Sequence, residues 1–255
     1  MLRIRVIPVL LLENGSLVKT VKFDKKTYIG DPINAIKIFN EKEVDELILL
    51  DINASKPNKE PNYKLLEYIA TECFMPFSYG GGVKNLKQIR KLFSIGIEKV
   101  VINAALHSDV TFLKEAVQIY GSQSIVASVD IKKNFFGQYG VYSYLDKKIV
   151  TKNIKNFIQK LETLGIGEIV FNDVNNDGVM NGYNIELIKL LNSLTTVPTV
   201  FCGGSKNFND LIKASKIGAM ALGAGSMFVY NGVHRAVLIN YPKQTQLQEL
   251  NNIVI

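Results

Sequence analysis

An internal repeat constrains the fold of this chain more than any other feature of its sequence. The segment 76–85 (PFSYGGGVKN) matches the segment 198–207 (PTVFCGGSKN), which lies 122 residues further along the chain. The same offset links Glu46 to Glu168. A repeat at one fixed offset over such a distance indicates a structure that is built from two similar halves.

Short runs rich in β-branched residues alternate with amphipathic segments along the whole chain. We predict eight strands, over Arg5–Leu12, Glu46–Asp51, Pro76–Tyr79, Lys99–Asn103, Ile125–Asp130, Glu168–Asn172, Thr199–Cys202 and Ala219–Ala224. We predict helices between them, over Pro32–Asn40, Tyr63–Thr71, Leu86–Ser94, Val110–Tyr120, Ile154–Leu164, Ile185–Leu194 and Phe208–Lys216. Apolar strands that alternate with helices are typical of a parallel sheet covered by helices. Eight such units predict an α/β fold, a closed (βα)8 TIM barrel made of two half-barrels.

The length of the chain fits a single barrel. We expect one domain over residues 1–255, because barrels of this kind commonly form one domain of about 250 residues. The segment 132–148 interrupts the alternation of strands and helices, and its Gly137 and Gly140 predict an inserted hairpin. We expect a helical tail at the C-terminal end.

The composition excludes several kinds of site and location. Cys73 and Cys202 cannot form a disulfide framework, and with only two histidines the chain shows no metal-ligand spacing. We therefore expect no metal and no cofactor. No stretch reaches the ~18–20 apolar residues of a membrane helix, and the run Val6–Leu12 indicates a first strand rather than a signal peptide. The formal charge of +7 comes from scattered lysines, so we expect a cytoplasmic protein that binds neither membrane nor nucleic acid.

Glycine-rich loops follow predicted strands in both halves of the chain. Gly80–Gly82 follows the third strand, Gly203–Ser205 has the equivalent place in the second half, and Gly225 and Ser226 follow the eighth strand. Glycine lets backbone N–H groups approach an anion closely, and each loop leads into a helix N-terminus. A single pair of glycines more often marks a tight turn. Because the feature occurs twice at symmetric places, we predict two phosphate sites and a phosphorylated substrate.

Charged residues are predicted to meet at the N-terminal mouth of the barrel. Side chains alternate along a strand, so counting back by twos from Asn103 places Lys99 in the lumen. The same parity predicts a charged ring formed by Arg5, Glu46, Lys99 and Glu168. Unpaired burial of these charges would cost several kcal/mol, so we expect them to pair. A stabilising plug of salt bridges is the alternative to a functional ring, since barrel floors usually serve stability.

Several motifs together identify a resemblance to a known family. They are Asn14-Gly15, Gly30-Asp31-Pro32, Leu50-Asp51, the run 77–82 (FSYGGG), Ile102-Asn103, Gly121-Ser122-Gln123, Val129-Asp130, Asp177-Gly178 and Gly182-Tyr183. From Met1 to about Asn231, the chain resembles the cyclase subunit of imidazole glycerol phosphate synthase, the ammonia-using barrel of histidine biosynthesis. The resemblance implies a subunit of the lyase or cyclase type in a glutamine amidotransferase complex.

The resemblance also implies roles for individual residues. Gly82 and Asn103 would line one phosphate pocket. The second pocket would be lined by Asp177, Gly178, Gly204, Gly225 and Ser226. Lys19 matches a family lysine on the flexible loop after strand one, where it either binds substrate or is only solvated. The charged ring matches positions that gate ammonia from a docked glutaminase, and the lack of a nucleophile motif in this chain implies that the glutaminase is a separate subunit of a heterodimer.

The chain departs from the family at the centre of the predicted active site. The family uses two aspartates, at the ends of strands one and five, as acid and base. This chain keeps Asp130 on strand five, but the matching position on strand one is Leu11. Leucine cannot transfer a proton, and the loss of a general acid or base typically lowers the rate ~10²–10⁴-fold. Glu13 shares the parity of Leu11 and is a possible substitute, while Ala104 and Asn175 replace a family hydroxyl and a family aspartate.

Three functions are consistent with these residues. The first is a paralogue that docks a glutaminase and channels ammonia with an impaired cyclase step, and serves lipopolysaccharide (surface-sugar) biosynthesis together with a sugar amidotransferase. The second is a genuine cyclase subunit of histidine biosynthesis. The third is a non-catalytic scaffold that binds a phosphosugar. Leu11 favours the first and third functions and the charged ring favours the first and second, so the sequence favours the first.

Overall fold

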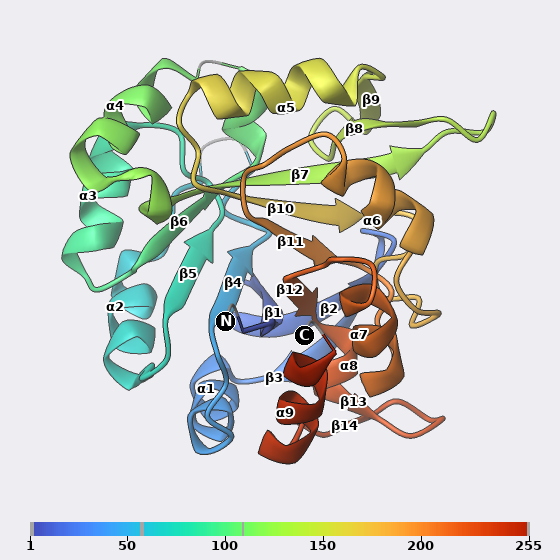
Figure 1. Ribbon diagram of the computed structural model, residues 1–255. Coiled ribbons are helices and arrows are strands. Elements are labelled where there is room, and N and C mark those ends of the chain that lie inside the picture. The colour runs from blue at the N-terminus through green and yellow to red at the C-terminus, as the bar shows by residue number, and fades with distance from the viewer. Residues whose placement is uncertain (1–2, 57–58, 109, 254–255) are drawn as a thin grey trace.

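Eight parallel strands form a closed barrel at the centre of the molecule (Figure 1). The computed structural model describes residues 3–56, 59–108 and 110–253, so the predicted domain limits at residues 1 and 255 lie outside the described residues. In spatial order the strands are β1 (Arg5–Glu13), β4 (Leu47–Asp51), β5 (Phe77–Gly80), β6 (Lys99–Ile102), β7 (Ile125–Lys133), β10 (Glu168–Asp173), β11 (Thr199–Cys202) and β12 (Ala221–Ala224). β12 pairs in parallel with β1 and closes the barrel. The predicted (βα)8 barrel is therefore confirmed.

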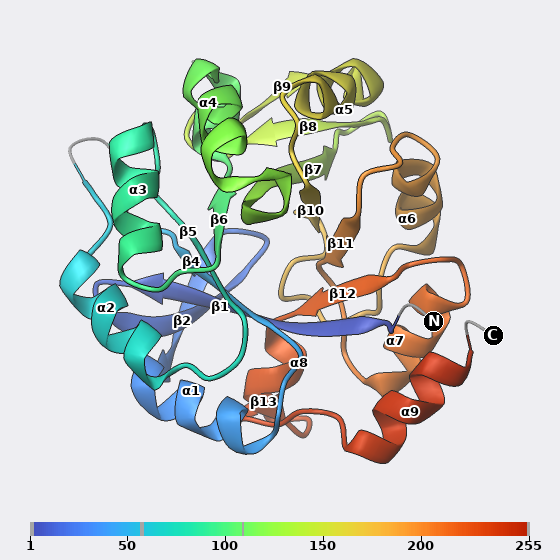
Figure 2. The same cartoon turned by 60° about the vertical axis from the view of Figure 1, so that its left-hand side comes forward.

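Helices surround the barrel and cover the outer face of its strands (Figure 2). They are α1 (Pro32–Glu41), α2 (Tyr63–Glu72), α3 (Leu86–Ser94), α4 (Thr111–Tyr120), α5 (Ile154–Thr163), α6 (Ile185–Asn192), α7 (Phe208–Ser215) and α9 (Gln244–Asn252). The local sequence explains where several of them begin. The side chains of Asp31, Asn62 and Asn85 accept hydrogen bonds from first-turn N–H groups of α1, α2 and α3.

The alternation of side chains along the strands produces two separate apolar clusters. The larger one lies between the strands and the helices. The inner apolar cluster fills the lumen and consists of Ile7, Val9, Ile48, Val101, Val126, Val170, Val200, Cys202 and Ala221. Successive side chains of a strand point to opposite faces, so the inner residues recur at every second position. The lumen is consequently apolar between its two ends.

An antiparallel hairpin follows β1, where the sequence predicted a flexible loop. The chain turns at Asn14-Gly15, and β1 pairs with β2 (Ser16–Val21), which pairs with β3 (Lys25–Gly30). Both turn residues have positive φ, 51° and 82°, as an Asn-Gly hairpin turn favours. The prediction of a loop was wrong because the buried middle of β2 contains the polar residues Lys19 and Thr20, which hide the apolar pattern of a strand.

A second antiparallel extension follows β7, within the segment where the sequence predicted an insertion. β7 pairs with β8 (Tyr139–Ser143), and β8 pairs with β9 (Lys148–Thr151). The rings of Phe23, in the turn between β2 and β3, and Tyr144, after β8, meet edge to face with centroids 6.0 Å apart. The two extensions therefore meet above the C-terminal end of the barrel.

The remaining elements are short. They are the 3-10 turns η1 (Ala104–His107) and η2 (Ser122–Ser124), the helix α8 (Ser226–Val229), and the strand pair β13 (Tyr230–Asn231) and β14 (Ala236–Val237). The last helix returns to the start of the barrel, where Asn251 Oδ1 accepts a hydrogen bond from Ile4 N at 2.8 Å. Within the described ranges, none of the helices has the length and apolar character needed to cross a membrane.

Candidate functional site

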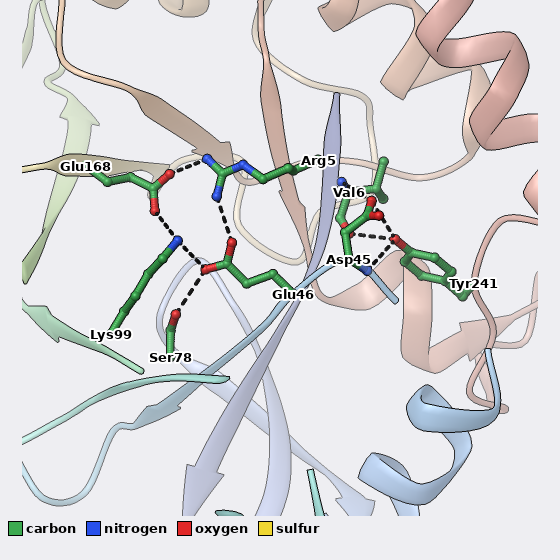
Figure 3. Close-up of polar contacts among 8 residues, drawn as sticks. All are labelled: Arg5, Val6, Asp45, Glu46, Ser78, Lys99, Glu168 and Tyr241. Atoms are coloured by element: carbon green, nitrogen blue, oxygen red, sulfur yellow. Dashed lines mark hydrogen bonds and ion pairs between the residues drawn. The ribbon is translucent and has the colours of Figure 1, made fainter. Parts of the chain in front are cut away.

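The charged ring occupies the N-terminal end of the barrel (Figure 3). Arg5 Nη1 lies 2.7 Å from Glu46 Oε2, and Arg5 Nη2 donates to Glu168 Oε1. Lys99 Nζ lies 2.9 Å from Glu46 Oε1 and 3.1 Å from Glu168 Oε2. Each cation therefore contacts both anions, and the signs of charge alternate around the ring. The structure brings the four residues together as one closed network.

The ring is balanced in charge and deeply placed. The side chains of Glu46 and Glu168 are 5% and 7% exposed, whereas those of Arg5 and Lys99 are 31% and 23% exposed. Carboxylates removed from water need partners, and each of these faces two cations. Burial works against the charged form of Arg5, but the charges and hydrogen bonds of Glu168 and Glu46 outweigh it and raise the pKa of Arg5. The ring thus stays ionised, with its cations nearest to the outer surface.

Ser78 belongs to the ring although the sequence analysis did not select it. Its hydroxyl donates to Glu46 Oε1 at 3.0 Å and is 1% exposed (Figure 3). The register pairs Ser78 with Ile48 and Lys99 on the two neighbouring strands. The same count along the strands that placed the charges inward therefore also places Ser78 inward, and could have found it.

A second polar contact lies next to the ring and holds the C-terminal segment. The hydroxyl of Tyr241 donates to the backbone oxygen of Val6 at 2.7 Å and lies 3.3 Å from Asp45 Oδ2 (Figure 3). Arg3 forms an ion pair with Asp45 at 3.1 Å. Burial, together with the negative charge of Asp45, raises the pKa of Tyr241, so the phenol stays protonated and serves as a donor. This contact fixes the segment before α9 against the floor of the barrel.

Asp130 lies on β7, at the opposite end of the lumen. It is 6% exposed, and its Oδ2 accepts a hydrogen bond from Asn103 Nδ2 at 3.0 Å. The side chain of Asn172 donates a further hydrogen bond to the same carboxyl group. Burial raises the pKa of Asp130 to about 7, although the two amides lower it. A carboxyl group with a pKa near neutrality can take up and release a proton, as general acid–base chemistry requires.

A first cavity of about 130 Å³ opens beside Asp130. Its wall includes Leu11, Asn103 and Ala104, so the position that lacks the family carboxylate does face the predicted reaction centre. Gly82, which we predicted for this pocket, is not among the lining residues. Its backbone N–H donates instead to Ser55 Oγ at 3.3 Å, and this contact uses the group that we expected to bind phosphate.

Two other carboxyl groups lie near the first cavity. Asp51 is on its wall, accepts hydrogen bonds from Asn53 N at 2.9 Å and Ala54 N at 3.0 Å, and has its pKa raised by burial. Glu13 does not line the cavity, because Lys26 Nζ holds its carboxylate at 2.5 Å on the rim. Asp51, rather than the predicted substitute Glu13, therefore shares the cavity with Asp130.

A second cavity lies between the loops of the other half-barrel. It is lined by every residue that we predicted for the second phosphate pocket, namely Asp177, Gly178, Gly204, Gly225 and Ser226. Lys19 and Leu11 also line it. The two cavities thus share the wall at position 11, and the reaction centre lies between them.

Lys19 is enclosed in the second cavity. Its side chain is buried, and Nζ donates to the backbone oxygen of Val9 at 3.2 Å, so the alternative that it is merely solvated was wrong. Burial lowers the pKa of Lys19, while the charges of Asp177 and Cys202 work in the opposite direction. Gly225 permits this close approach, because a Cβ atom there would collide with Nζ. An ammonium group among glycine loops is suited to hold a phosphate.

Asp177 fastens the β2–β3 hairpin over this cavity. Thr20 Oγ1 donates to Asp177 Oδ2 at 2.8 Å, and Lys22 N donates to the backbone oxygen of Asp177 at 2.9 Å. Gly178 has a φ of +67°, and a Cβ atom at this position would collide with the backbone oxygen of Thr20. The lysine at position 19 is therefore held in place by contacts from the loop after β10. Asn175 also belongs to this loop, and its Oδ1 accepts from Lys133 N at 2.7 Å.

Neither cysteine has the environment of a nucleophile. Burial raises the pKa of Cys73 to about 11 and that of Cys202 to about 12. A nucleophilic cysteine instead needs a lowered pKa, because the thiolate is the reactive form. Among the described residues, no three His, Cys, Asp or Glu side chains are grouped as ligands for a metal ion. The chemistry available in this chain therefore centres on Asp130, its amide partners and the two cavities.

Comparison with known proteins supports the resemblance seen in the sequence. Residues 5–235 match the family model described as "Histidine biosynthesis protein". A Pseudomonas aeruginosa protein named "Putative imidazole glycerol phosphate synthase subunit hisF2" is 48% identical over 248 residues, which cover 97% of this chain and 99% of that protein. A Leptospira borgpetersenii protein named as a putative HisF subunit of the same synthase is 44% identical over 252 residues, covering 98% and 99%.

A relative with an unqualified name is more distant. The imidazole glycerol phosphate synthase subunit HisF of Petrotoga mobilis is 35% identical over 237 residues, which cover 92% of this chain and 94% of that protein. The names of these three relatives mention the synthase, and they do not mention surface sugars or a sugar amidotransferase. The similarity extends over nearly the whole chain in each case.

Proposed function

Because this chain belongs to the histidine biosynthesis protein family, we propose that it is the ammonia-receiving cyclase subunit of an imidazole glycerol phosphate synthase. The observation that carries the proposal is the order of three features along one barrel. The charged ring lies at one end, the inner apolar cluster follows, and the cavity with Asp130 lies at the other end. This order suits a small molecule that enters through the ring and reacts beside Asp130.

The inner apolar cluster supports neutral ammonia as that molecule. An ammonium ion in an apolar lumen would lose its hydration without a partner, at a cost of several kcal/mol. Neutral NH₃ avoids this cost. Since neither cysteine is suited to attack glutamine, a separate glutaminase would supply the ammonia. The partly exposed cations Arg5 and Lys99 offer a docked glutaminase a way to open the ring.

The two cavities support a phosphorylated substrate. Lys19 and the glycine loops around Gly204 and Gly225 would hold one phosphate, through a cation and backbone N–H groups. Asn103 and the loop at Gly81 would hold the other end of the substrate. The reacting carbon and nitrogen atoms would then lie between the cavities, within reach of Asp130. Asp130 would both donate and accept protons, since its pKa of about 7 permits either role.

Leu11 favours a second candidate function. A barrel without the second carboxylate would receive ammonia and bind a phosphosugar, yet would cyclise slowly or deliver the ammonia elsewhere. The surface-sugar acceptor predicted from the sequence has no support in the names of the relatives. This candidate therefore rests on the chemistry of position 11 alone, and the cyclase is the better supported function.

One experiment tests both candidates. The chain is co-expressed with the glutaminase from the same genome, and the complex is assayed with the phosphorylated substrate of the synthase, using either ammonium chloride or glutamine. Formation of imidazole glycerol phosphate with both nitrogen sources supports the cyclase. A stable heterodimer that hydrolyses glutamine without forming this product supports the second candidate. Absence of both the heterodimer and the product contradicts both candidates.

The ring has a test of its own within this complex. Arg5→Ala removes one of the two cations and leaves Glu46 and Glu168 with Lys99 alone. If the ring controls the passage of ammonia, the variant complex should release ammonia into the medium as it hydrolyses glutamine, while the barrel remains folded. Full coupling in the variant would favour the alternative of a stabilising plug.

A further inference from the structure

The side-chain oxygen of Asn172 is buried and has no hydrogen-bond partner. Over the ranges that the structure describes, it is the only buried side-chain oxygen or nitrogen in this condition. An acceptor buried without a partner costs on the order of 1–3 kcal/mol, so such atoms are rare in folded proteins. An unsatisfied acceptor at the end of β10, beside a candidate reaction centre, indicates that a ligand supplies the missing donor.

The position of Asn172 indicates where that donor would come from. The register places Asn172 beside Asp130 on β7 and beside Cys202 on β11, and the residue lines both cavities. Two positions earlier on the same strand, Val170 belongs to the inner apolar cluster. Asn172 is therefore the first amide that a molecule meets on β10 after it has crossed the apolar part of the lumen.

The orientation of the amide is fixed by Asp130. The side-chain nitrogen of Asn172 donates to the Asp130 carboxyl group, and this hydrogen bond lowers the pKa of Asp130. The nitrogen and oxygen of an amide diverge from the same carbon, so the oxygen is directed away from Asp130. An amide oxygen can only accept, which excludes a phosphate oxygen or any other pure acceptor as its partner. The partner has to carry an N–H or O–H group.

We propose that Asn172 Oδ1 binds the nitrogen that ammonia contributes to the product, accepting an N–H first from ammonia and then from the imidazole ring. This inference rests on the proposed function, because it takes ammonia and imidazole glycerol phosphate as the ligands. One amide would then contact both the incoming nitrogen and Asp130, and would hold the two groups at a fixed spacing. Asn172 would thereby select a neutral N–H donor at the centre of the site.

Binding of the product tests this inference without any turnover. The affinity of the purified barrel for imidazole glycerol phosphate is measured by titration calorimetry, with glycerol 3-phosphate as the probe that lacks the ring. Asn172→Leu should weaken the binding of imidazole glycerol phosphate about tenfold, as expected when a buried hydrogen bond is lost, and should leave glycerol 3-phosphate unchanged. Asn172→Thr should retain most of the affinity, because its hydroxyl can accept from the ring and donate to Asp130.

Two further variants guard the comparison. Asn172→Ala removes the same oxygen without adding bulk, and serves if the leucine variant does not fold. Asn156→Leu makes the matched change at an exposed position on α5 and should alter neither affinity. In turnover assays, the loss of the oxygen should raise the KM for ammonium more than it lowers kcat. A purely structural role would not separate these two constants.

The outcomes distinguish the inference from the function on which it rests. If the native barrel binds imidazole glycerol phosphate and Asn172→Ala binds it equally well, the inference is overturned and the proposed function stands. If the variant weakens both probes alike, the oxygen serves the phosphate end or the fold, and the inference is again overturned. If the native barrel does not bind imidazole glycerol phosphate at all, the proposed function fails and the inference fails with it.

Discussion

The two ends of the barrel hold their ionisable side chains in opposite ways. At the N-terminal end, each member of the charged ring contacts two side chains of opposite charge. At the C-terminal end, Asp130 is held by two neutral amides, and the printed partner of Lys19 Nζ is a backbone oxygen. Both ends are buried in the same barrel, so the difference lies in the partners and not in the depth.

This difference decides which groups can exchange protons near neutral pH. A buried charge that faces opposite charges keeps its ionised form, as the raised pKa of Arg5 shows. A buried charge with only neutral partners is destabilised, so the pKa of Asp130 rises to about 7 and that of Lys19 falls. The ring is therefore suited to be a fixed electrostatic barrier, whereas the C-terminal end is suited to proton transfer.

The inner apolar cluster keeps the two arrangements apart. Val9, Val101 and Val170 lie between the ring and the layer that contains Asp130. Without this layer, the cations of the ring would lie closer to Asp130 and would favour its ionised form. The apolar lumen consequently has two effects, since it admits a neutral molecule and also preserves the raised pKa of Asp130.

The largest expected effect is on catalysis at the C-terminal end. Asp130→Asn keeps the shape and the amide contacts but removes the only lumen carboxyl with a pKa near 7. We expect turnover with ammonium chloride to fall ~10²–10⁴-fold, the usual effect of losing a proton-transfer group. The measurement is product formation at saturating substrate. Glu115→Gln, on the exposed face of α4, is the matched control and should keep native activity. Normal turnover in Asp130→Asn would show that proton transfer resides elsewhere, with Asp51 as the next carboxyl to examine.

The same substitution should change how stability depends on pH. The pKa of Asp130 is raised when the chain folds, so the native protein loses stability as pH rises from the unfolded value near 4 to about 7. Asp130→Asn does not titrate. Its advantage over the native protein in urea unfolding should therefore grow by on the order of 2–3 kcal/mol between pH 5 and pH 8. An advantage that does not change with pH would mean that the carboxyl is not destabilised by burial.

At the N-terminal end, the expected effect on stability is smaller and has the opposite origin. Arg5→Met leaves Glu46 and Glu168 with one cation. Breaking a fully buried ion pair costs about 3–5 kcal/mol, and because Arg5 is about one-third exposed we expect about 2 kcal/mol. Urea unfolding at pH 7 provides the measurement. Adding Glu168→Gln should restore part of the loss, because it removes one of the two competing anions.

An exposed ion pair supplies the control for this prediction. Arg3 is 52% exposed and pairs with Asp45 at 3.1 Å. Arg3→Met should therefore cost less than about 1 kcal/mol, as is usual for surface pairs. Equal losses in Arg3→Met and Arg5→Met would contradict the view that the ring depends on mutual compensation in a buried place.

The barrel and the ring could be predicted from the sequence because both depend on regular spacing. Lys99 and Glu168 were placed by counting along strands, and the repeat offset identified equivalent units in the two halves. The β2–β3 hairpin could not be found in this way. Its buried Lys19 and Thr20 are satisfied by Val9 and Asp177, which are distant in the sequence, so the local pattern of a strand is absent.

The candidate site shows the same division. The residues of the second phosphate pocket were chosen from motifs, and they line one cavity because the repeat fixes which loops share an end of the barrel. Gly82 was chosen for the same reason, but the side chain of Ser55 takes its N–H group, and no pattern in the sequence indicates that contact. The unpaired oxygen of Asn172 was equally hidden, since parity shows that a side chain faces inward without showing which of its atoms are satisfied.

The smallest expected effect concerns position 11, where the C-terminal end lacks a second carboxylate. Leu11→Asp places a carboxyl group in the first cavity opposite Asp130 and should raise turnover with ammonium chloride about tenfold, below the full effect usual for a proton-transfer group. The gain should be partial because burying a carboxyl near Asp130 raises its pKa. It should also destabilise the fold by about 1–3 kcal/mol, as measured by urea unfolding.

A neighbouring residue tests whether position 11 itself matters. Leu50 pairs with Leu11 in the register of β1 and β4 and lines the same cavity, so Leu50→Asp adds the same charge to the same space from the adjacent strand. We expect the loss of stability in this variant but no gain in turnover, because proton transfer depends on geometry as well as on pKa. If both variants gain equally, the effect is merely an added charge. If the native chain already turns over as fast as Leu11→Asp, Leu11 does not impair the cyclase, and Asp51, which shares the cavity with Asp130, becomes the candidate for the second proton-transfer group.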